Sequence, residues 1–248
     1  MASAPIPAAT LVVFRDRRDG PPDLLMVERA KAMVFAGGAM VFPGGRIDPG
    51  DHALAATIGA GDDGAARIAA IRETIEEAGL AIGLHPAPSA ATLAAIRARL
   101  HGGEAFAAIL ADTGSTLNLD ALVPFARWLP DHRTTRIFDT LFFLARAPEG
   151  AAATVDATEN VRLVWTGAAA LLAEADAGRA TIIYPTRRTL ERLALFADHD
   201  AAVAQARAYP IRTITPFVET RDGVPHLCIP DDLGYPVTGE AMTRAQRG

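Results

Sequence analysis

Residues 39 to 80 change their hydrophobic period once, and this change restricts the fold more than any other feature of the chain. The short apolar run AMVF, residues 39 to 42, has the composition of a strand and leads into PGGRIDPGD, where glycines and prolines require an irregular loop. From Gly64 onward, apolar residues recur at spacings of three and four, as on one face of an amphipathic helix, and Gly79 is a suitable end. We therefore expect a strand, an irregular loop and a helix in succession.

Strands and helices also alternate along the rest of the chain. Two stretches predict helices, GAAALLAEADAG after residue 166 and PTRRTLERLALFADH at 185 to 199, the second with proline in its first turn. The strand-like stretches are ATLVVF (9 to 14), DLLMVER (23 to 29), LVPFARWL (122 to 129), RIFDTLFFLARA (136 to 147) and VRLVWT (161 to 166). The first two flank the turn-prone RDRRDGPP and predict a hairpin. This order favours an α/β/α sandwich with a mixed sheet and helices on both faces.

Length and composition favour a single globular domain over residues 1–248. Half of the residues are hydrophobic and 21% are charged, and no linker or internal repeat divides the chain. Residues 86–119 are alanine-rich and helical in pattern with a break at His101, so they predict a helical insertion. This insertion has two open interpretations, a cover over the substrate or an interface, and the choice between monomer and homodimer is open with it.

Charge and cysteine content exclude several classes of function. A net charge of -5 and a pI near 5.7 disfavour nucleic acid and anionic membranes as partners, because phosphate polymers would be repelled. The amino-terminal segment has neither a basic leader nor a long apolar run. The single cysteine, Cys228, excludes an intramolecular disulfide and a cysteine-rich zinc site and is expected to be a small buried side chain. We therefore expect a cytoplasmic protein that acts on a small molecule.

The stretch RETIEEAGL, residues 72 to 80, concentrates negative charge near the end of its helix. Glu73 is a helical neighbour of Glu76 and Glu77, and each such like-charge pair costs roughly 0.2 to 0.5 kcal/mol on an exposed helix. One interpretation is a solvated face with an Arg72–Glu76 pair. The other is a divalent cation held between the glutamates and backbone carbonyls of the glycine loop. Ligands that are all oxygens favour Mg²⁺ or Mn²⁺ over zinc.

The same stretch resembles the second half of the Nudix box, G-x5-E-x7-R-E-U-x-E-E-x-G-U with U aliphatic, and only Thr74 departs from it. Gly45 and Asp51 resemble the first half of the box, although the pattern has glutamate at the position of Asp51. Gly45 to Arg72 spans 27 positions where the pattern has 14, so about 13 residues are inserted, near residues 52–64.

An interrupted box is also a feature of the peroxisomal coenzyme A diphosphatase branch of the Nudix superfamily. The resemblance extends to the FPGG lead-in, to FDTLFFLA (138 to 145) and to IRTITPFV (211 to 218). It implies a Nudix-type fold and metal-dependent hydrolysis of coenzyme A or acyl-coenzyme A to 3',5'-ADP and a phosphopantetheine. The alternatives are hydrolysis of ADP-ribose, a dinucleotide or another nucleoside diphosphate derivative, and a non-catalytic Nudix-fold module that binds a nucleotide.

The resemblance implies roles for residues of the box. Glu73, Glu76 and Glu77 are the expected metal ligands, together with the carbonyl of Gly45, and Glu76 and Glu77 belong to the catalytic machinery. Arg72 is expected to orient the glutamates by a bidentate contact. Two interpretations remain for the first acidic position: either Asp51 fills it, or an acid closer to the helix start, Asp62 or Asp63, does so.

Outside the box, the candidates rest on position alone. Glu159, in the loop TVDATEN, is a candidate catalytic base, with an ordinary loop acid as the alternative. Arg127, Arg133 and Arg136 lie around a strand and a turn, where they are candidates for a substrate phosphate or form a solvated basic loop. His52 lies beside the glycine loop and is a candidate for its polar lining. The other histidines are scattered without ligand spacing and are expected at the surface: His85, His101, His132, His199 and His226.

Overall fold

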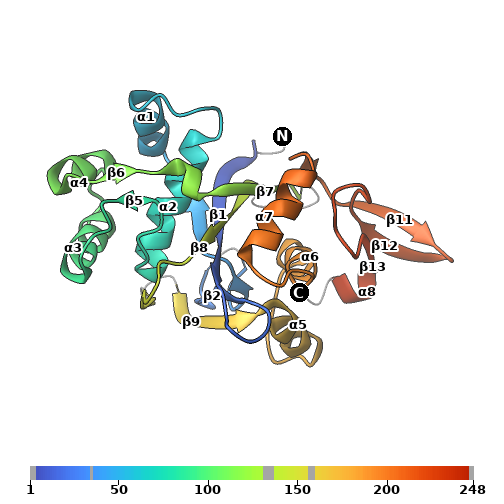
Figure 1. Ribbon diagram of the computed structural model, residues 1–248. Coiled ribbons are helices and arrows are strands. Elements are labelled where there is room, and N and C mark those ends of the chain that lie inside the picture. Colours follow the sequence, from blue (N-terminus) through green and yellow to red (C-terminus); the bar gives the residue numbers. More distant parts are fainter. Residues whose placement is uncertain (1–3, 34–35, 131–136, 156–159, 246–248) are drawn as a thin grey trace.

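The computed structural model describes residues 4–33, 36–130, 137–155 and 160–245 (Figure 1). Within these residues, one mixed sheet runs through the centre of the molecule. Its strands, in spatial order, are β10 (Thr213–Ile214), β7 (Val123–Trp128), β8 (Phe138–Arg146), β1 (Ile6–Arg15), β2 (Asp23–Arg29) and β3 (Met40–Val41), with β4 (Gly44–Arg46) paired to β1 and β9 (Asn160–Gly167) paired to β2.

The predicted hairpin of the first two strands forms only at its turn. β1 and β2 pair at Phe14 with Leu24 and at Arg15 with Asp23. Beyond these pairs β1 pairs with β4 and in parallel with β8, whereas β2 pairs with β3 and β9. A side chain at Gly44 would overlap with the β1 backbone, so only glycine lets β4 approach β1 this closely. The separation of β1 from β2 brings the glycine loop into the sheet.

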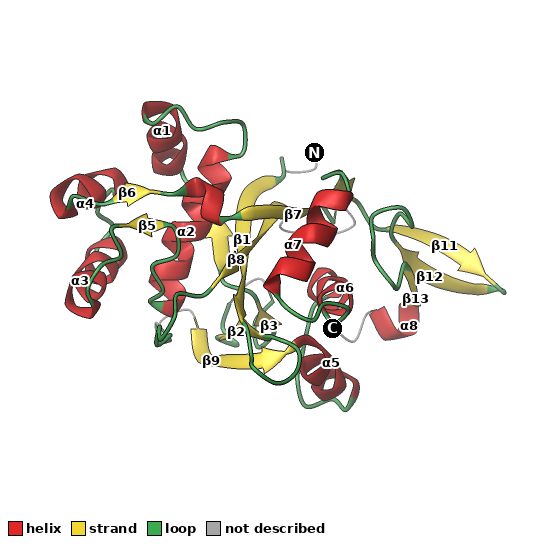
Figure 2. Cartoon of the chain, in the orientation of Figure 1, coloured by secondary structure: helices red, strands yellow, loops and turns green. Residues whose placement is uncertain are grey.

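Helices cover both faces of this sheet (Figure 2). On β1, Leu11 and Val13 enter one apolar cluster and Val12 and Phe14 enter the other, because successive strand residues point to opposite faces. One face packs against α1 (Pro49–Thr57), α2 (Gly64–Ala78), α3 (Ala90–His101) and α4 (Phe106–Thr113). The other packs against α5 (Ala168–Asp176), α6 (Tyr184–Leu193) and α7 (His199–Ala208). The predicted α/β/α sandwich is confirmed.

The predicted helix over residues 185–199 is two helices. α6 ends at Leu193, and α7 starts after Asp198, whose side chain accepts a hydrogen bond from the backbone N–H of Ala201 at 2.8 Å. This N-cap ends the apparent run, because it gives the second helix its own start. The prediction of one helix was therefore wrong at its carboxyl end.

The smaller elements lie outside the sandwich. A protruding sheet consists of β11 (Phe217–Arg221), β12 (Val224–Cys228) and β13 (Gly239–Ala241), followed by α8 (Met242–Ala245). β5 (Leu84–His85), β6 (Thr116–Leu117) and a 3-10 turn (Leu119–Ala121) flank α3 and α4. Among the helices that the structure describes, none has the length and apolar character needed to cross a membrane.

Candidate active site

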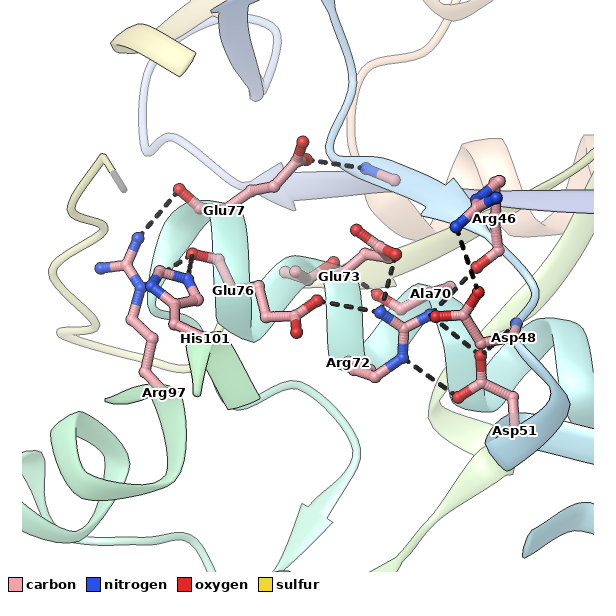
Figure 3. A network of polar contacts seen from close by, with 12 residues as sticks. Arg46, Asp48, Asp51, Ala70, Arg72, Glu73, Glu76, Glu77, Arg97 and His101 are labelled. Atoms are coloured by element: carbon pink, nitrogen blue, oxygen red, sulfur yellow. Dashed lines mark hydrogen bonds and ion pairs between the residues drawn. The ribbon is translucent and has the colours of Figure 1, made fainter. Parts of the chain in front are cut away.

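On α2, the apolar residues and the glutamates lie on different faces, as the helical spacing of its apolar residues predicts. Ile68, Ile71 and Ile75 are fully buried beneath the sheet. The helix ends where predicted, at Gly79, which adopts a left-handed conformation with φ of 62°. Because the apolar face fixes the rotation of the helix, the glutamates in its last two turns face the glycine loop of β4 (Figure 3).

Glu77 is the most deeply enclosed of the three glutamates, with an exposed fraction of 4%. Its Oε2 accepts a hydrogen bond from the backbone N–H of Gly44 at 2.9 Å, and its Oε1 accepts one from Nδ2 of Asn160 at 3.0 Å. Burial, with repulsion from Glu73, raises the pKa of Glu77 to about 8. Hydrogen bonds from Asn160 and Gly44 lower this pKa, but they do not offset the effect of burial. Glu77 is thus an acid whose ionised form requires a positive partner.

Glu73 packs directly against the glycine loop. A Cβ atom at Gly45 would overlap with the carboxylate carbon and both carboxylate oxygens of Glu73, so the missing side chain leaves room for this carboxylate. Burial raises the pKa of Glu73 to about 7, against the opposing effect of Arg72. The backbone of the loop and the carboxylate of the helix therefore face each other, as the sequence predicts.

Arg72 lies at the centre of the polar network (Figure 3). Its Nη1 donates to Glu73 at 2.7 Å and to Glu76 at 2.9 Å, and its Nη2 donates to the carbonyl of Arg46 at 3.0 Å. Its bidentate partner, however, is Asp51, reached at 3.1 Å from Nε and 2.9 Å from Nη2. The prediction that the bidentate contact goes to the glutamates was wrong, because Nη1 alone serves both of them.

Asp51 is positioned by α1, the helix that contains part of the inserted residues. It lies in the first turn of α1, is 2% exposed, and accepts from the backbone N–H of Asp48 at 2.9 Å. The extra residues form the rest of α1 and the turn that follows, so Asp51 meets Arg72 across 21 positions of sequence. Asp63 instead pairs with Arg67 at 2.8 Å, and Asp62 is exposed. Asp51 thus occupies the first acidic position by geometry.

The three glutamates line one end of a cavity of about 830 Å³. α2 contributes the carboxylates, and β4 contributes Gly44 and Gly45. Aromatic side chains form part of the remaining wall and come from β7, β8, the start of α6 and the residue after β3: Trp128, Phe138, Phe142, Tyr184 and Phe42. The cavity therefore joins an acidic end to an apolar wall.

Two residues of the site were not found by sequence reasoning. Asn160, at the start of β9, is fully buried against Glu77, and Arg29 pairs with it across the end of β2. Arg29 lines the cavity, its Nε is buried without a hydrogen-bond partner, and it makes no ion pair within the described residues. Both residues are at strand ends, which sequence alone cannot align. The charge of Arg29 lowers the pKa of Glu77, and a cavity-lining arginine at this position also suits an anionic substrate group.

The other sequence candidates have different outcomes. Arg127 is bound by Asp139 at 2.8 and 2.6 Å and is not available for a phosphate. His101 is exposed but also borders the cavity, so a purely surface position was too simple. Cys228 is buried, as predicted. Four candidates lie outside the described residues, and their roles stay predictions: Glu159, Arg133, Arg136 and His132.

The donor set fits a hard divalent cation. Glu73, Glu76 and Glu77 offer only oxygen ligands, and the pKa of each is raised mainly by burial, so a cation would favour their ionised forms. Within the described residues, no three acidic, histidine or cysteine side chains form a preformed metal cluster. Arg72 holds Glu73 and Glu76 with one nitrogen, so an ion would have to replace part of that contact.

Replacing Gly45 with alanine is expected to weaken Mn²⁺ binding at least about tenfold, because the added methyl group displaces the Glu73 carboxylate. The measurement is the free Mn²⁺ signal in electron paramagnetic resonance during titration. Gly50→Ala is the matched control, since a Cβ at that position meets no atom within 4 Å. Equal Mn²⁺ affinity in the two variants would remove Gly45 from the site.

Comparison with solved structures gives a substantial match. The chain is similar to a NUDIX hydrolase from Alicyclobacillus acidocaldarius, with 29% sequence identity and a TM-score of 0.73, over 82% of this chain and 97% of that chain. A weaker likeness is to a MutT protein from Methanosarcina mazei Go1, with 13% identity and a TM-score of 0.47 over 78% of this chain and 95% of that chain. Another is to a C. elegans Ap4A hydrolase, with 18% identity and a TM-score of 0.42 over 75% of this chain and 92% of that chain. No protein-family model matches the chain.

Proposed function

We propose that this chain, whose fold and enzyme class are those of the Nudix hydrolases that act on phosphoric anhydrides, hydrolyses the pyrophosphate linkage of coenzyme A or acyl-coenzyme A. The products are 3',5'-ADP and the corresponding phosphopantetheine. One water is consumed: its oxygen bonds to one phosphorus, the bridging P–O bond breaks, and a proton passes from the water to a base.

The carrying observation is a single cavity in which three carboxylates face an aromatic wall. A pyrophosphate is repelled by such carboxylates unless divalent cations lie between them. Glu73, Glu76 and Glu77, with the carbonyl of Gly45, would hold Mg²⁺ or Mn²⁺. When bound, such an ion polarises phosphoryl oxygens and lowers the pKa of the attacking water. The aromatic side chains suit the adenine ring or the organic part of the substrate.

Two arginines assist by different means. Arg72 orients Glu73 and Glu76 and is itself held by Asp51, so it acts through the glutamates. Arg29 lines the cavity and makes no ion pair among the residues that the structure describes, and we assign it to a phosphate oxygen of the substrate. The interrupted box resembles that of the coenzyme A branch and supports this assignment. The insertion leaves the Asp51–Arg72 contact intact, so it is compatible with an active site.

The decisive experiment incubates the protein with Mg²⁺ and a panel of coenzyme A, acyl-coenzymes A, ADP-ribose and a dinucleotide, with products identified by mass. We expect 3',5'-ADP from the coenzyme A compounds. Cleavage of ADP-ribose with coenzyme A untouched would overturn the branch assignment. If Mn²⁺ binds but no compound of the panel is cleaved, a nucleotide-binding module without catalysis is favoured.

Arg29→Ala is expected to raise KM for the cleaved substrate about 10- to 100-fold, because a charged hydrogen bond contributes roughly 1.5 to 3 kcal/mol. The reading is the steady-state KM and kcat at saturating Mg²⁺. Arg162→Ala is the control, since Arg162 is on the neighbouring strand, is 60% exposed and pairs with Glu28. An unchanged KM in Arg29→Ala would exclude Arg29 from substrate binding.

A further inference from the structure

α3 of the helical insertion meets the carboxyl end of α2, where Glu76 and Glu77 are located (Figure 3). Arg97 reaches from α3 with its whole guanidinium group. Its Nε donates to the carbonyl of Glu76 at 2.8 Å and its Nη2 donates to the carbonyl of Glu77 at 3.1 Å. Its Nη1 donates to the hydroxyl of Thr154 at 2.8 Å, which joins the contact to the segment after β8.

The last four carbonyls of a helix have no partner within the helix, and here each of them is satisfied. The carbonyl of Ile75 accepts from the N–H of Gly79 at 2.9 Å, and that of Ala78 accepts from the N–H of Thr154 at 2.9 Å. Arg97 donates hydrogen bonds to the two carbonyls between them, those of Glu76 and Glu77. Nε2 of His101 also lies 3.1 Å from the carbonyl of Glu76. The insertion therefore completes the end of α2.

This end of α2 carries three sources of negative charge close together: two glutamate side chains and the helix dipole. A last turn without caps frays, and fraying would move the backbone from which Glu76 and Glu77 project. A guanidinium at the carboxyl end opposes the dipole and holds two successive carbonyls at once. α3 also contributes Leu100 and His101 to the cavity wall, so it contacts both the end of α2 and the cavity.

We propose that Arg97 is a positioning residue of the active site, which holds the last turn of α2 so that Glu76 and Glu77 keep the placement needed for metal binding. The helical insertion is then a working part of the site. This inference rests on the proposed function, because it assigns Glu76 and Glu77 to a metal ion.

The experiment compares Arg97→Ala, Arg97→Lys and Arg99→Ala. Arg99 is the matched control, because it is on the same helix and binds Glu104 and Asp112 within the insertion. Mn²⁺ affinity is measured with the metal alone by electron paramagnetic resonance, together with Tm, KM and kcat. We expect Arg97→Ala to weaken Mn²⁺ binding and lower kcat about 10- to 100-fold, with KM for the substrate little changed.

Arg97→Lys keeps the charge but has one donor group, so it should recover part of both losses. Arg99→Ala should match the parent in affinity and kcat. The proposal is overturned if Arg97→Ala matches Arg99→Ala in Mn²⁺ affinity, or, should Arg97→Ala not fold, if Arg97→Lys equals the parent in affinity and kcat. The Mn²⁺ titration needs no substrate, so failure of the parent to cleave any diphosphate would count against the proposed function alone.

Discussion

Glu77→Gln is expected to lower kcat by about three orders of magnitude at pH 8 while the protein stays folded, because loss of one ligand charge removes several kcal/mol of metal-assisted stabilisation. Glutamine has the same length, and its carbonyl can still accept from the N–H of Gly44. Asn160 can turn its amide to accept from the new NH₂ group. The loss therefore reports on charge and metal binding, measured as turnover and Mn²⁺ affinity.

The same variant makes a prediction about pH. Burial raises the pKa of Glu77 to about 8 and that of Glu73 to about 7, from an ordinary value of 4.5. Between pH 4.5 and about 8, the folded, metal-free protein therefore binds more protons than the unfolded chain. Its stability falls as the pH rises through this range. Glu77→Gln removes the Glu77 part of this fall, so its Tm in a chelator should decline less between pH 5 and 9 than that of the parent.

Glu104→Gln controls for general effects of charge removal, because Glu104 is exposed and pairs with Arg99 away from the cavity. It should follow the parent in turnover and in the decline of Tm with pH. A Glu77→Gln protein with parental turnover would remove the metal site from this helix. An equal decline of Tm in parent and Glu77→Gln would show that Glu77 is not the buried acid responsible.

Asp51→Ala is expected to lower the free energy of unfolding by about 3 kcal/mol, because it leaves a buried guanidinium without its bidentate partner. Burial opposes the charge of Arg72, but contacts with Asp51, Glu73 and Glu76 outweigh it and raise the pKa of Arg72 above its usual value. Without Asp51, Arg72 is free to shift from the position that serves both glutamates. Activity should fall together with stability, as measured by denaturant titration and kcat.

Asp48→Asn is the matched control, since the Asp48 carboxylate is 48% exposed and lies 3.7 Å from the same Nη2 atom, and asparagine keeps a suitable N-cap for α1. A surface pair of this kind contributes about 0 to 1 kcal/mol. The double variant Asp51→Ala with Arg72→Met closes a double-mutant cycle and measures the coupling directly. If Asp51→Ala and Asp48→Asn cost the same stability, Asp51 is not the anchor of Arg72.

Local pattern was sufficient for the glutamate helix. The spacing of Ile68, Ile71 and Ile75 set its buried face, and Gly79 set its end. These features predict well because helical period and a left-handed glycine depend on residues within a few positions of each other. The placement of Glu73 against Gly45 follows from the same strand, loop and helix.

Contacts between distant segments were not predicted. Asn160 reaches Glu77 across 83 positions, and Arg97 comes from an alanine-rich helix that carries no recognisable motif. The predicted hairpin of β1 and β2 forms only next to its turn, because β4, β8 and β9 pair with the remaining parts of these strands. Strand pairing depends on the whole sheet, so local composition cannot choose among the partners.

The sequence by itself determined that three glutamates share one helical face beside a glycine loop, and it predicts that this face binds a divalent cation. Tertiary structure alone decided how the interrupted box closes: α1 returns Asp51 to Arg72. It also decided which residues complete the site, because Arg29, Asn160 and Arg97 arrive from separate strands and helices. Period and turn chemistry act over a few residues, whereas the partners of a buried charge are chosen by the packing of the whole chain.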